Sequence, residues 1–125
     1  MKKVFVAVVL IWCVSGCAQS GQTISPTDFE TKLGAEKNKI VLDVRTSDEF
    51  ASGHIANAQM IDFYKSDFKA NLVKLSKEKT IFVYCAGGVR SHQAVTMLEE
   101  LGFKKVIELK GGYKAWVSAG KPVVK

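Results

Sequence analysis

The sequence predicts an α/β protein in which helices cover both faces of a parallel β-sheet. Short apolar, β-branched segments alternate along the chain with segments whose apolar residues recur at helical spacing, an alternation typical of βαβ units. The predicted strands are nearly continuous apolar runs, as expected for strands covered on both faces. With 125 residues the chain has room for one such domain, and its 47% hydrophobic content excludes fully disordered and collagen-like chains.

Helix caps and glycines define the elements of the amino-terminal half of this domain. Ser25 before Pro26 is typical of a helix N-terminus, and Gly34 is expected to end that helix. Residues 39–44, KIVLDV, predict a buried strand. A short helix follows, which begins at Thr46 or Ser47, carries Glu49 in its first turn and stops at Gly53. Residues 58–61 predict a short strand.

The carboxy-terminal half continues the alternation. Phe68, Leu72 and Leu75 share one face of a helix predicted over residues 67–75, and residues 80–84, TIFVY, predict a second buried strand. A helix is predicted over residues 91–101, with Ser91 as its N-cap. Its inward face consists of Ala94, Met97, Leu98 and Leu101. A strand at 106–109 and a helix at 112–119 complete the domain.

The first residues of the chain have the pattern of a secretory signal. Two lysines precede an uncharged apolar run over residues 4–14, shorter than the roughly 20 residues that a membrane-spanning helix needs. The following residues, Val14-Ser15-Gly16-Cys17, resemble the lipobox of bacterial lipoproteins. A plain signal peptide and an amino-terminal buried strand are the alternative interpretations.

The lipobox resemblance implies cleavage before Cys17 and acylation of this residue, which would attach the protein to a lipid bilayer of the bacterial cell envelope. It divides the chain into a lipoprotein signal peptide (1–16), a lipidated tether (17–22) and a domain (23–125). Without the signal peptide, the net charge changes from +6 to 16 − 12 = +4. This balance favours small anionic ligands or surfaces, and no zinc-finger spacing or interleaving of basic and aromatic residues supports a nucleic-acid partner.

The three cysteines have different expected fates. Cys13 lies in the signal peptide and Cys17 is the predicted lipidation site, so Cys85 remains as the one free thiol. Because no resolving cysteine is left, a dithiol oxidoreductase is excluded. An unpaired thiol in an exported protein is either buried and inert or retained for its chemistry.

Cys85 opens a segment that predicts an anion-binding loop. The segment Cys85-Ala86-Gly87-Gly88-Val89-Arg90-Ser91 lies where a buried strand ends and a helix begins, the usual ligand-binding edge of a parallel sheet. Consecutive glycines allow several amides to point at one centre, and the helix N-terminus adds partial positive charge. We therefore predict Cys85 as a nucleophile of lowered pKa, with the residues of the loop, Ala86, Gly87, Gly88, Val89 and Arg90, binding an anionic substrate.

The same segments resemble the single-domain rhodaneses, a family of sulfurtransferases. The matching motifs are VLDVR at residues 41–45, Glu49-Phe50, GHIANA at 53–58, the strand end VYC at 83–85, Arg90-Ser91, and LKGGYKAW at 109–116. The resemblance implies a five-stranded parallel sheet. It also implies that Cys85 carries sulfane sulfur as a persulfide, taken from a small sulfur-containing anion such as thiosulfate and passed to a thiol or cyanide acceptor.

Other polar residues are interpreted as scaffold. Asp43 and Arg45 occupy a family signature, where we expect Arg45 to pair with Glu49 and Asp43 to accept hydrogen bonds from loop amides. His54 is expected to be satisfied by backbone groups, and Tyr113 with Trp116 to belong to the core or the pocket wall. With two histidines and one cysteine, the domain offers a poor zinc set, so we predict no metal and no cofactor.

Two other functions stay open at this point. The resemblance implies that related phosphatases and arsenate reductases have one more loop residue than the C-x4-R spacing from Cys85 to Arg90, so phosphatase activity is disfavoured. A sulfur carrier or partner-binding module that does not turn over is the main alternative to an enzyme. The sequence does not identify a protein partner.

Overall fold

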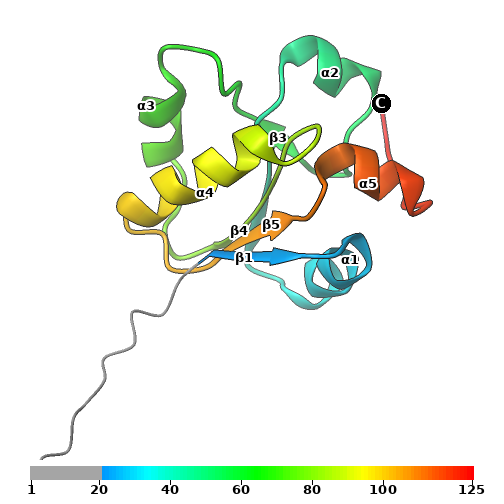
Figure 1. Cartoon of the computed structure of the whole chain (residues 1–125). Helices are drawn as coiled ribbons and strands as arrows, with labels where there is room; N and C mark the ends of the chain where they lie inside the picture. Colours follow the sequence, from blue (N-terminus) through cyan, green and yellow to red (C-terminus); the bar gives the residue numbers. More distant parts are fainter. Residues whose placement is uncertain (1–20) are drawn as a thin grey trace, which may run out of the picture.

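The computed structural model describes residues 21–125, so the predicted signal peptide, Cys13, Cys17 and the first residues of the tether lie outside the described part of the chain. Five strands and five helices follow one another (Figure 1). They are β1 (Gly21–Ile24), α1 (Pro26–Ala35), β2 (Lys39–Asp43), α2 (Ser47–Ser52), β3 (Gln59–Met60), α3 (Phe68–Val73), β4 (Thr80–Tyr84), α4 (Val89–Glu100), β5 (Val106–Leu109) and α5 (Gly112–Ser118).

The strands form one parallel sheet in the order β1-β5-β4-β2-β3, which confirms the predicted five-stranded α/β architecture. All strands point the same way, so every strand begins at one edge of the sheet and ends at the opposite one. We call these the amino edge and the carboxyl edge. The central strand β4 is buried along its whole length, as its apolar sequence predicts.

Two hydrophobic clusters hold the helices against the two faces of the sheet. On one face, Phe68 and Leu72 of α3 and Ala94 and Leu98 of α4 pack on the strands. On the other face, Phe29 of α1 and Trp116 of α5 meet edge to face, with ring centroids 6.0 Å apart. The expected inward face of α4 is confirmed for Ala94 and Leu98, whereas Met97 and Leu101 are only partly buried.

Strand β1 corrects the predicted domain boundary. The tether was predicted to include Gly21 and Gln22, but these residues pair with Val106 and Ile107 of β5. The segment is polar and half-exposed, so it has no apolar run that could mark it as a strand. It is a strand because it completes the hydrogen bonds along the edge of β5. The domain therefore includes Gly21 and Gln22.

Two of the three predicted helix N-caps agree with the structure. Ser25 caps α1 by accepting a hydrogen bond from the amide of Asp28 (3.2 Å), and Thr46 forms a reciprocal capping box with Glu49 in α2. Ser91 is not the N-cap of α4, since that helix already begins at Val89 after Gly88. Within residues 21–125, no helix has the length and apolar content needed to cross a membrane.

Candidate active site

Cys85 lies at the carboxyl edge, directly after the central strand β4 and before α4. The preceding strand is fully buried, so the position of the cysteine is determined by the middle of the sheet rather than by a surface loop. The residue is only 1% exposed, and its thiol is free. Gly88 turns the loop with a φ of +110°, a conformation that side chains disfavour, and this turn brings its amide back toward the sulfur.

Two groups contact the sulfur directly. The amide of Gly88 donates a hydrogen bond to Sγ (3.0 Å), and the thiol lies 3.4 Å from Oγ of Ser91. Burial of Cys85 opposes ionisation, but the side-chain hydrogen bond with Ser91 and the hydrogen bonds from the amides of Ser91, Gly88 and Gly87 outweigh it and lower the pKa of the thiol. The amide of Gly88 thus faces the sulfur, and the binding of an anionic substrate by the loop after Cys85 stays a prediction.

A buried carboxylate that the sequence did not single out lies behind Ser91. The Ser91 hydroxyl donates to Oε2 of Glu108 in β5 (2.6 Å), and the hydroxyl of Thr23 in β1 donates to Oε1 (3.0 Å). The imidazole of His92, largely exposed, lies 3.3 Å from the same Oε1. Glu108 therefore orients Ser91 toward Cys85, and it finds enough partners to remain buried.

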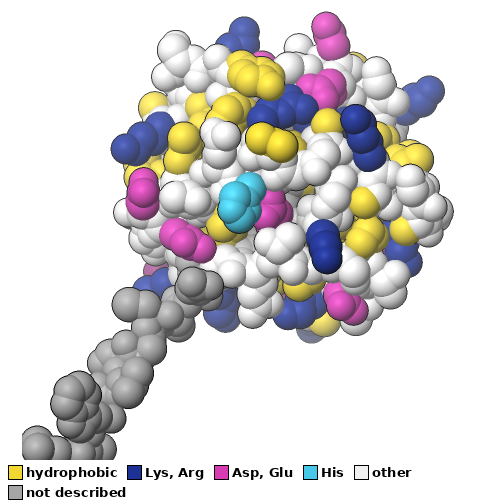
Figure 2. Space-filling model, viewed as in Figure 1, with side chains coloured by type: hydrophobic (Ala, Val, Ile, Leu, Met, Phe, Trp, Pro, Cys, Tyr) yellow, Lys and Arg dark blue, Asp and Glu magenta, His cyan; other side chains and the backbone are white. Residues whose placement is uncertain are grey.

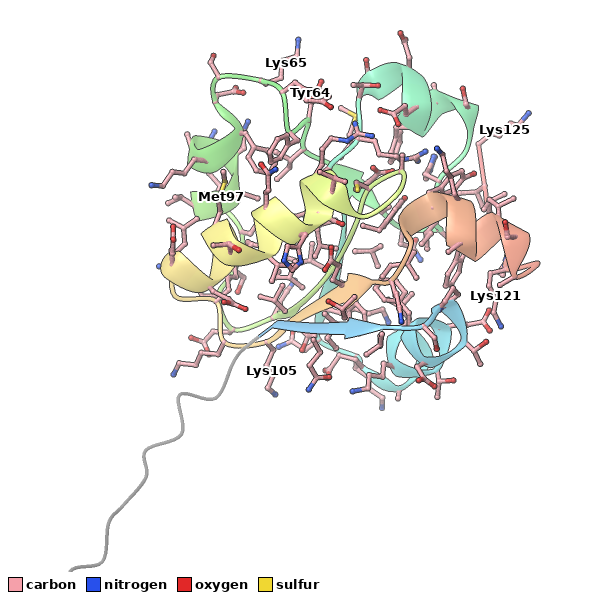
Figure 3. The ribbon with its side chains drawn as sticks, in the orientation of Figure 1. Tyr64, Lys65, Met97, Lys105, Lys121 and Lys125 are labelled. Atoms are coloured by element: carbon pink, nitrogen blue, oxygen red, sulfur yellow. The ribbon has the colours of Figure 1, made fainter. Side chains whose placement is uncertain are left out.

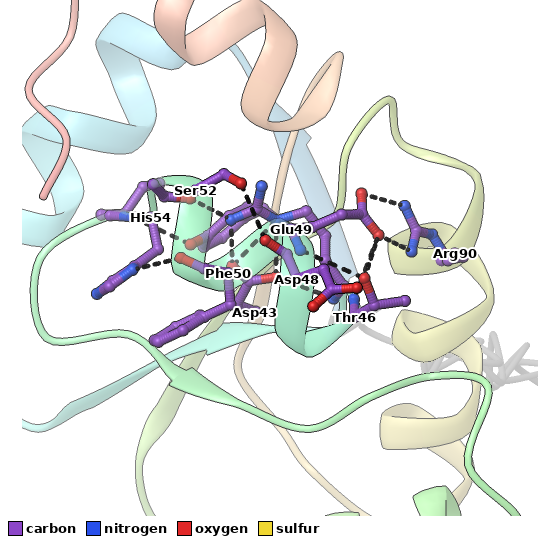
Figure 4. Close-up of polar contacts among 12 residues, drawn as sticks. Asp43, Thr46, Asp48, Glu49, Phe50, Ser52, His54 and Arg90 are labelled. Carbon is purple, nitrogen blue, oxygen red and sulfur yellow. Dashed lines mark hydrogen bonds and ion pairs between the residues drawn. The ribbon is translucent and has the colours of Figure 1, made fainter. Parts of the chain in front are cut away.

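Arg90 pairs with a carboxylate of α2, although its place in the loop after Cys85 suggests that it binds an anionic substrate. Its guanidinium forms two parallel hydrogen bonds with the carboxylate of Glu49 in α2, at 2.8 and 3.0 Å (Figure 4). The hydrogen bond from Arg90 is the main cause that lowers the pKa of Glu49 to about 2, so the pair stays charged throughout the neutral range. The hydrogen bond to Glu49 is the main cause that raises the pKa of Arg90, and Cys85 contributes little to it. A direct role of Arg90 in substrate binding stays a prediction.

The pairing of Glu49 with Arg90 corrects the expected Arg45–Glu49 ion pair. Arg45 instead pairs with Asp43 (2.7 Å) and donates to the carbonyl of Gly53 (2.7 Å), and its guanidinium lies 4.2 Å from the ring centre of Tyr113. Asp43 accepts from the side chain of Arg45 and from its amide, which belongs to the loop between β2 and α2. Both residues are buried, which is consistent with their scaffold interpretation.

Gly112, at the start of α5, lies against the backbone of the loop that begins at Cys85. The amides that follow it, of Tyr113 and Lys114, donate to the carbonyls of Cys85 (2.7 Å) and Ala86 (3.1 Å). A Cβ at Gly112 would stand 2.6 Å from the Cys85 carbonyl oxygen, and its φ is +65°. Sequence reasoning placed Gly112 at a helix start but gave no signal that its backbone touches the nucleophile's own peptide.

The remaining candidates have structural roles. Nδ1 of His54 forms a hydrogen bond with the carbonyl of Phe50 (2.9 Å), as expected for a histidine satisfied by backbone groups (Figure 4). The imidazole of His54 also stacks on the ring of Phe50. Trp116 is buried and donates to the carbonyl of Pro122 (2.8 Å). Within residues 21–125, no group of three or more His, Cys, Asp or Glu side chains is arranged to hold a metal ion.

The contacts of the sulfur lead to a prediction about its titration. We expect the alkylation rate of Cys85 to rise with pH about a midpoint below the ordinary thiol pKa of about 8.5. Replacing Ser91 by alanine removes a hydrogen bond that lowers the pKa, so the midpoint should move up. The matched control is Thr23→Val, which removes a hydroxyl from the same Glu108 without touching sulfur. An equal shift in both variants would contradict a direct role of Ser91.

The fold and site together define a class of protein. A parallel α/β domain presents one buried cysteine, with a lowered pKa, in an amide-lined loop at the end of its central strand. Residues 25–119 match the model of the rhodanese-like domain, and the chain belongs to this family.

Individual relatives agree with this assignment. The chain is 29% identical to a sulfurtransferase of Allochromatium vinosum, over 81% of this chain and 92% of that protein. Among solved structures, a rhodanese-related protein of Thermoplasma volcanium superposes with a TM-score of 0.73 at 34% identity, over 82% of this chain and 97% of that one. A Rhodopseudomonas palustris protein described as a possible tyrosine phosphatase has a TM-score of 0.71 at 26% identity.

Other relatives are much longer proteins. The chain is 32% identical to the probable adenylyltransferase/sulfurtransferase MoeZ of Mycobacterium tuberculosis, but it spans only 27% of that protein. It is 36% identical to a tRNA uridine(34) hydroxylase of Chlamydia felis and spans 36% of it. In both cases the match covers 84% or more of this chain, so the shared part is the domain itself.

Proposed function

We propose that this protein is a sulfurtransferase that carries sulfane sulfur on Cys85 as a persulfide. The observation that carries the proposal is the buried Cys85 thiol, whose sulfur accepts a hydrogen bond from the Gly88 amide (3.0 Å) and lies 3.4 Å from Oγ of Ser91. The same donors that favour a thiolate would favour the terminal sulfur of a persulfide anion. The family and its sulfurtransferase-named relatives support this function.

The chemistry divides into two balanced half-reactions. The Cys85 thiolate attacks the outer sulfur of thiosulfate, a sulfur–sulfur bond forms, and the bond to the sulfonate sulfur breaks with its electron pair leaving on sulfite. A cysteine persulfide anion remains in the loop. A nucleophile such as cyanide or a thiolate then takes the terminal sulfur and restores the Cys85 thiolate.

The direct test is the mass of the purified protein after incubation with thiosulfate. We expect a gain of one sulfur atom before acceptor is added, its loss on adding cyanide or a thiol, and ping-pong steady-state kinetics. No gain of sulfur from thiosulfate, polysulfide or a low-molecular-weight persulfide would contradict the proposal. A stable gain without turnover toward cyanide or thiols would identify a sulfur carrier instead of an enzyme.

We further propose that the protein is anchored in the bacterial cell envelope through an acylated Cys17. The support is the VSGC sequence after an apolar run too short to span a bilayer. Replacing Cys17 by alanine is expected to move the protein from the membrane fraction to the soluble fraction or to stop its processing. Fractionation of cells followed by mass analysis checks this, with Cys13→Ala as the matched control. A membrane-bound, fully processed Cys17→Ala product would refute the anchor.

A further inference from the structure

Lysines gather at the amino edge of the sheet, the end opposite Cys85. They lie at the ends of helices, in the turns that follow them and at the starts of strands, so the parallel topology brings them to one side of the molecule. Lys105 extends beyond this edge near the start of β1, whereas Tyr64 and Lys65 lie at the other end of the domain (Figure 3). The set, which we call the basic edge, consists of Lys32, Lys37, Lys39, Lys74, Lys77, Lys79, Lys104 and Lys105.

Carboxylates offset only half of the charge of the basic edge. Four of them, Glu36, Glu78, Glu99 and Glu100, lie in the same turns and helix ends, so the edge carries 8 − 4 = +4. This equals the whole net charge of residues 21–125, 16 − 12 = +4. Among the described residues, none of these eight lysines forms an ion pair. Their hydrogen bonds go to neutral groups, for example from Lys32 to the side-chain amide of Gln22 (3.1 Å).

The basic edge is also hollowed. A cavity of about 480 Å³ is lined by Lys32, Lys104 and Lys105, and a second of about 420 Å³ by Lys39, Lys74 and Lys79. Lys77 reaches toward Gly102, close to Lys104 and Lys105 in the chain. Figure 2 shows both basic and acidic side chains beside the point where the described chain begins. The first hollow is therefore lined by three lysines and one carboxylate, that of Glu36, and the second by three lysines and no carboxylate.

Gly21, at the start of β1, lies beside the basic edge. Strand β1 starts at the amino edge, because it runs parallel to the other strands and its first residue pairs with the first residue of β5. Only four residue steps separate Gly21 from Cys17, and a fully extended chain spans about 14 Å over that length. An acylated Cys17 would therefore hold the amino edge close to the lipid headgroups.

We propose that the basic edge is a docking surface for a bilayer containing anionic phospholipids. This inference rests on the proposed lipid anchor, and it adds a second, electrostatic attachment to the acyl chains. Docking in this orientation places the Cys85 loop at the far end of the sheet, roughly 16 Å away along the five residues of β4. The active site would face the aqueous compartment and accept sulfur donors from there.

Residues 21–125 are suited to a direct test because they are expected to fold alone. All five strands and both hydrophobic clusters lie within them, and the solved Thermoplasma volcanium chain is matched over 97% of its length by this domain alone. This piece lacks the apolar run and Cys17, so its partition onto vesicles reports the basic edge and not the anchor.

The experiment measures partition of this piece onto vesicles of phosphatidylcholine, with or without about a quarter of phosphatidylglycerol. We expect binding only to the anionic vesicles, and its loss at about 0.5 M salt because the charges are then screened. The triple variant Lys77→Gln, Lys104→Gln, Lys105→Gln should lower the partition coefficient by at least about tenfold. The matched control is Lys65→Gln, Lys110→Gln, Lys114→Gln, which removes the same charge from exposed lysines at the carboxyl edge.

The outcomes separate this inference from the proposed anchor. An equal loss in both triple variants would show attraction by net charge alone and overturn the docking surface. Absence of binding to anionic vesicles would overturn it as well, whatever the Cys17→Ala fractionation shows. Equal or tighter binding to a single-stranded RNA, reduced by the same amino-edge variant, would assign the surface to nucleic acid instead. A selective loss on vesicles with weak RNA binding supports the proposal.

Discussion

Replacing Cys85 by serine is expected to abolish sulfur uptake from thiosulfate and to lower transfer to cyanide by at least about a thousandfold. A serine hydroxyl in this loop would remain protonated, and it cannot form a persulfide. The surroundings should be undisturbed, because oxygen replaces sulfur in a site whose partners, the Gly88 amide and the Ser91 hydroxyl, can hydrogen-bond to either atom. The measurement is intact mass after thiosulfate, together with the rate of thiocyanate formation.

The control for this variant concerns the other cysteines of the chain. Cys13 and Cys17 lie outside the described residues, so the same assay is run on a Cys13→Ala, Cys17→Ala double variant, which should still gain one sulfur atom. Unchanged circular dichroism would show that Cys85→Ser remains folded. Sulfur uptake by a folded Cys85→Ser protein would place the transfer on another residue and refute the proposed persulfide.

Replacing Gly112 by alanine is expected to be strongly destabilising and to impair sulfur transfer together with stability. The new methyl group would stand 2.6–2.7 Å from the Cys85 carbonyl oxygen and from backbone atoms of Ala86, which cannot move without displacing the nucleophile. The positive φ of +65° adds a conformational cost of about 1–2 kcal/mol. We expect the free energy of unfolding to fall by at least about 3 kcal/mol in a denaturant titration.

Gly34→Ala is the matched control for Gly112→Ala. Gly34 lies inside α1, has an ordinary negative φ, and a Cβ there would meet no atom within 4 Å. Because alanine favours a helix interior over glycine, this variant should gain roughly 0.5–1 kcal/mol and retain full sulfur transfer. A Gly112→Ala protein with unchanged stability and activity would show that the contact between α5 and the Cys85 loop is not needed.

Local sequence was sufficient for most of the fold. The continuous apolar runs at residues 39–44 and 80–84 predict buried parallel strands, because only strands covered on both faces place every side chain in a core. Ser25 and Thr46 predict helix starts because each cap hydrogen bond closes within three residues. The polar strand β1 escaped prediction because pairing with β5, rather than its own composition, makes it a strand.

The sequence alone also singled out Cys85 as the candidate nucleophile and the loop amides beside it. Cys85, the turn at Gly88 and the start of α4 lie within five consecutive residues, so their chemistry depends on local backbone geometry and little else. Only the tertiary structure decided what surrounds them. Glu49 pairs with Arg90, 41 residues away, rather than with its neighbour Arg45, and Glu108 reaches Ser91 across 17 residues. Such partners depend on the strand order and register of the sheet, because several charged residues compete for each carboxylate and only the folded geometry selects among them.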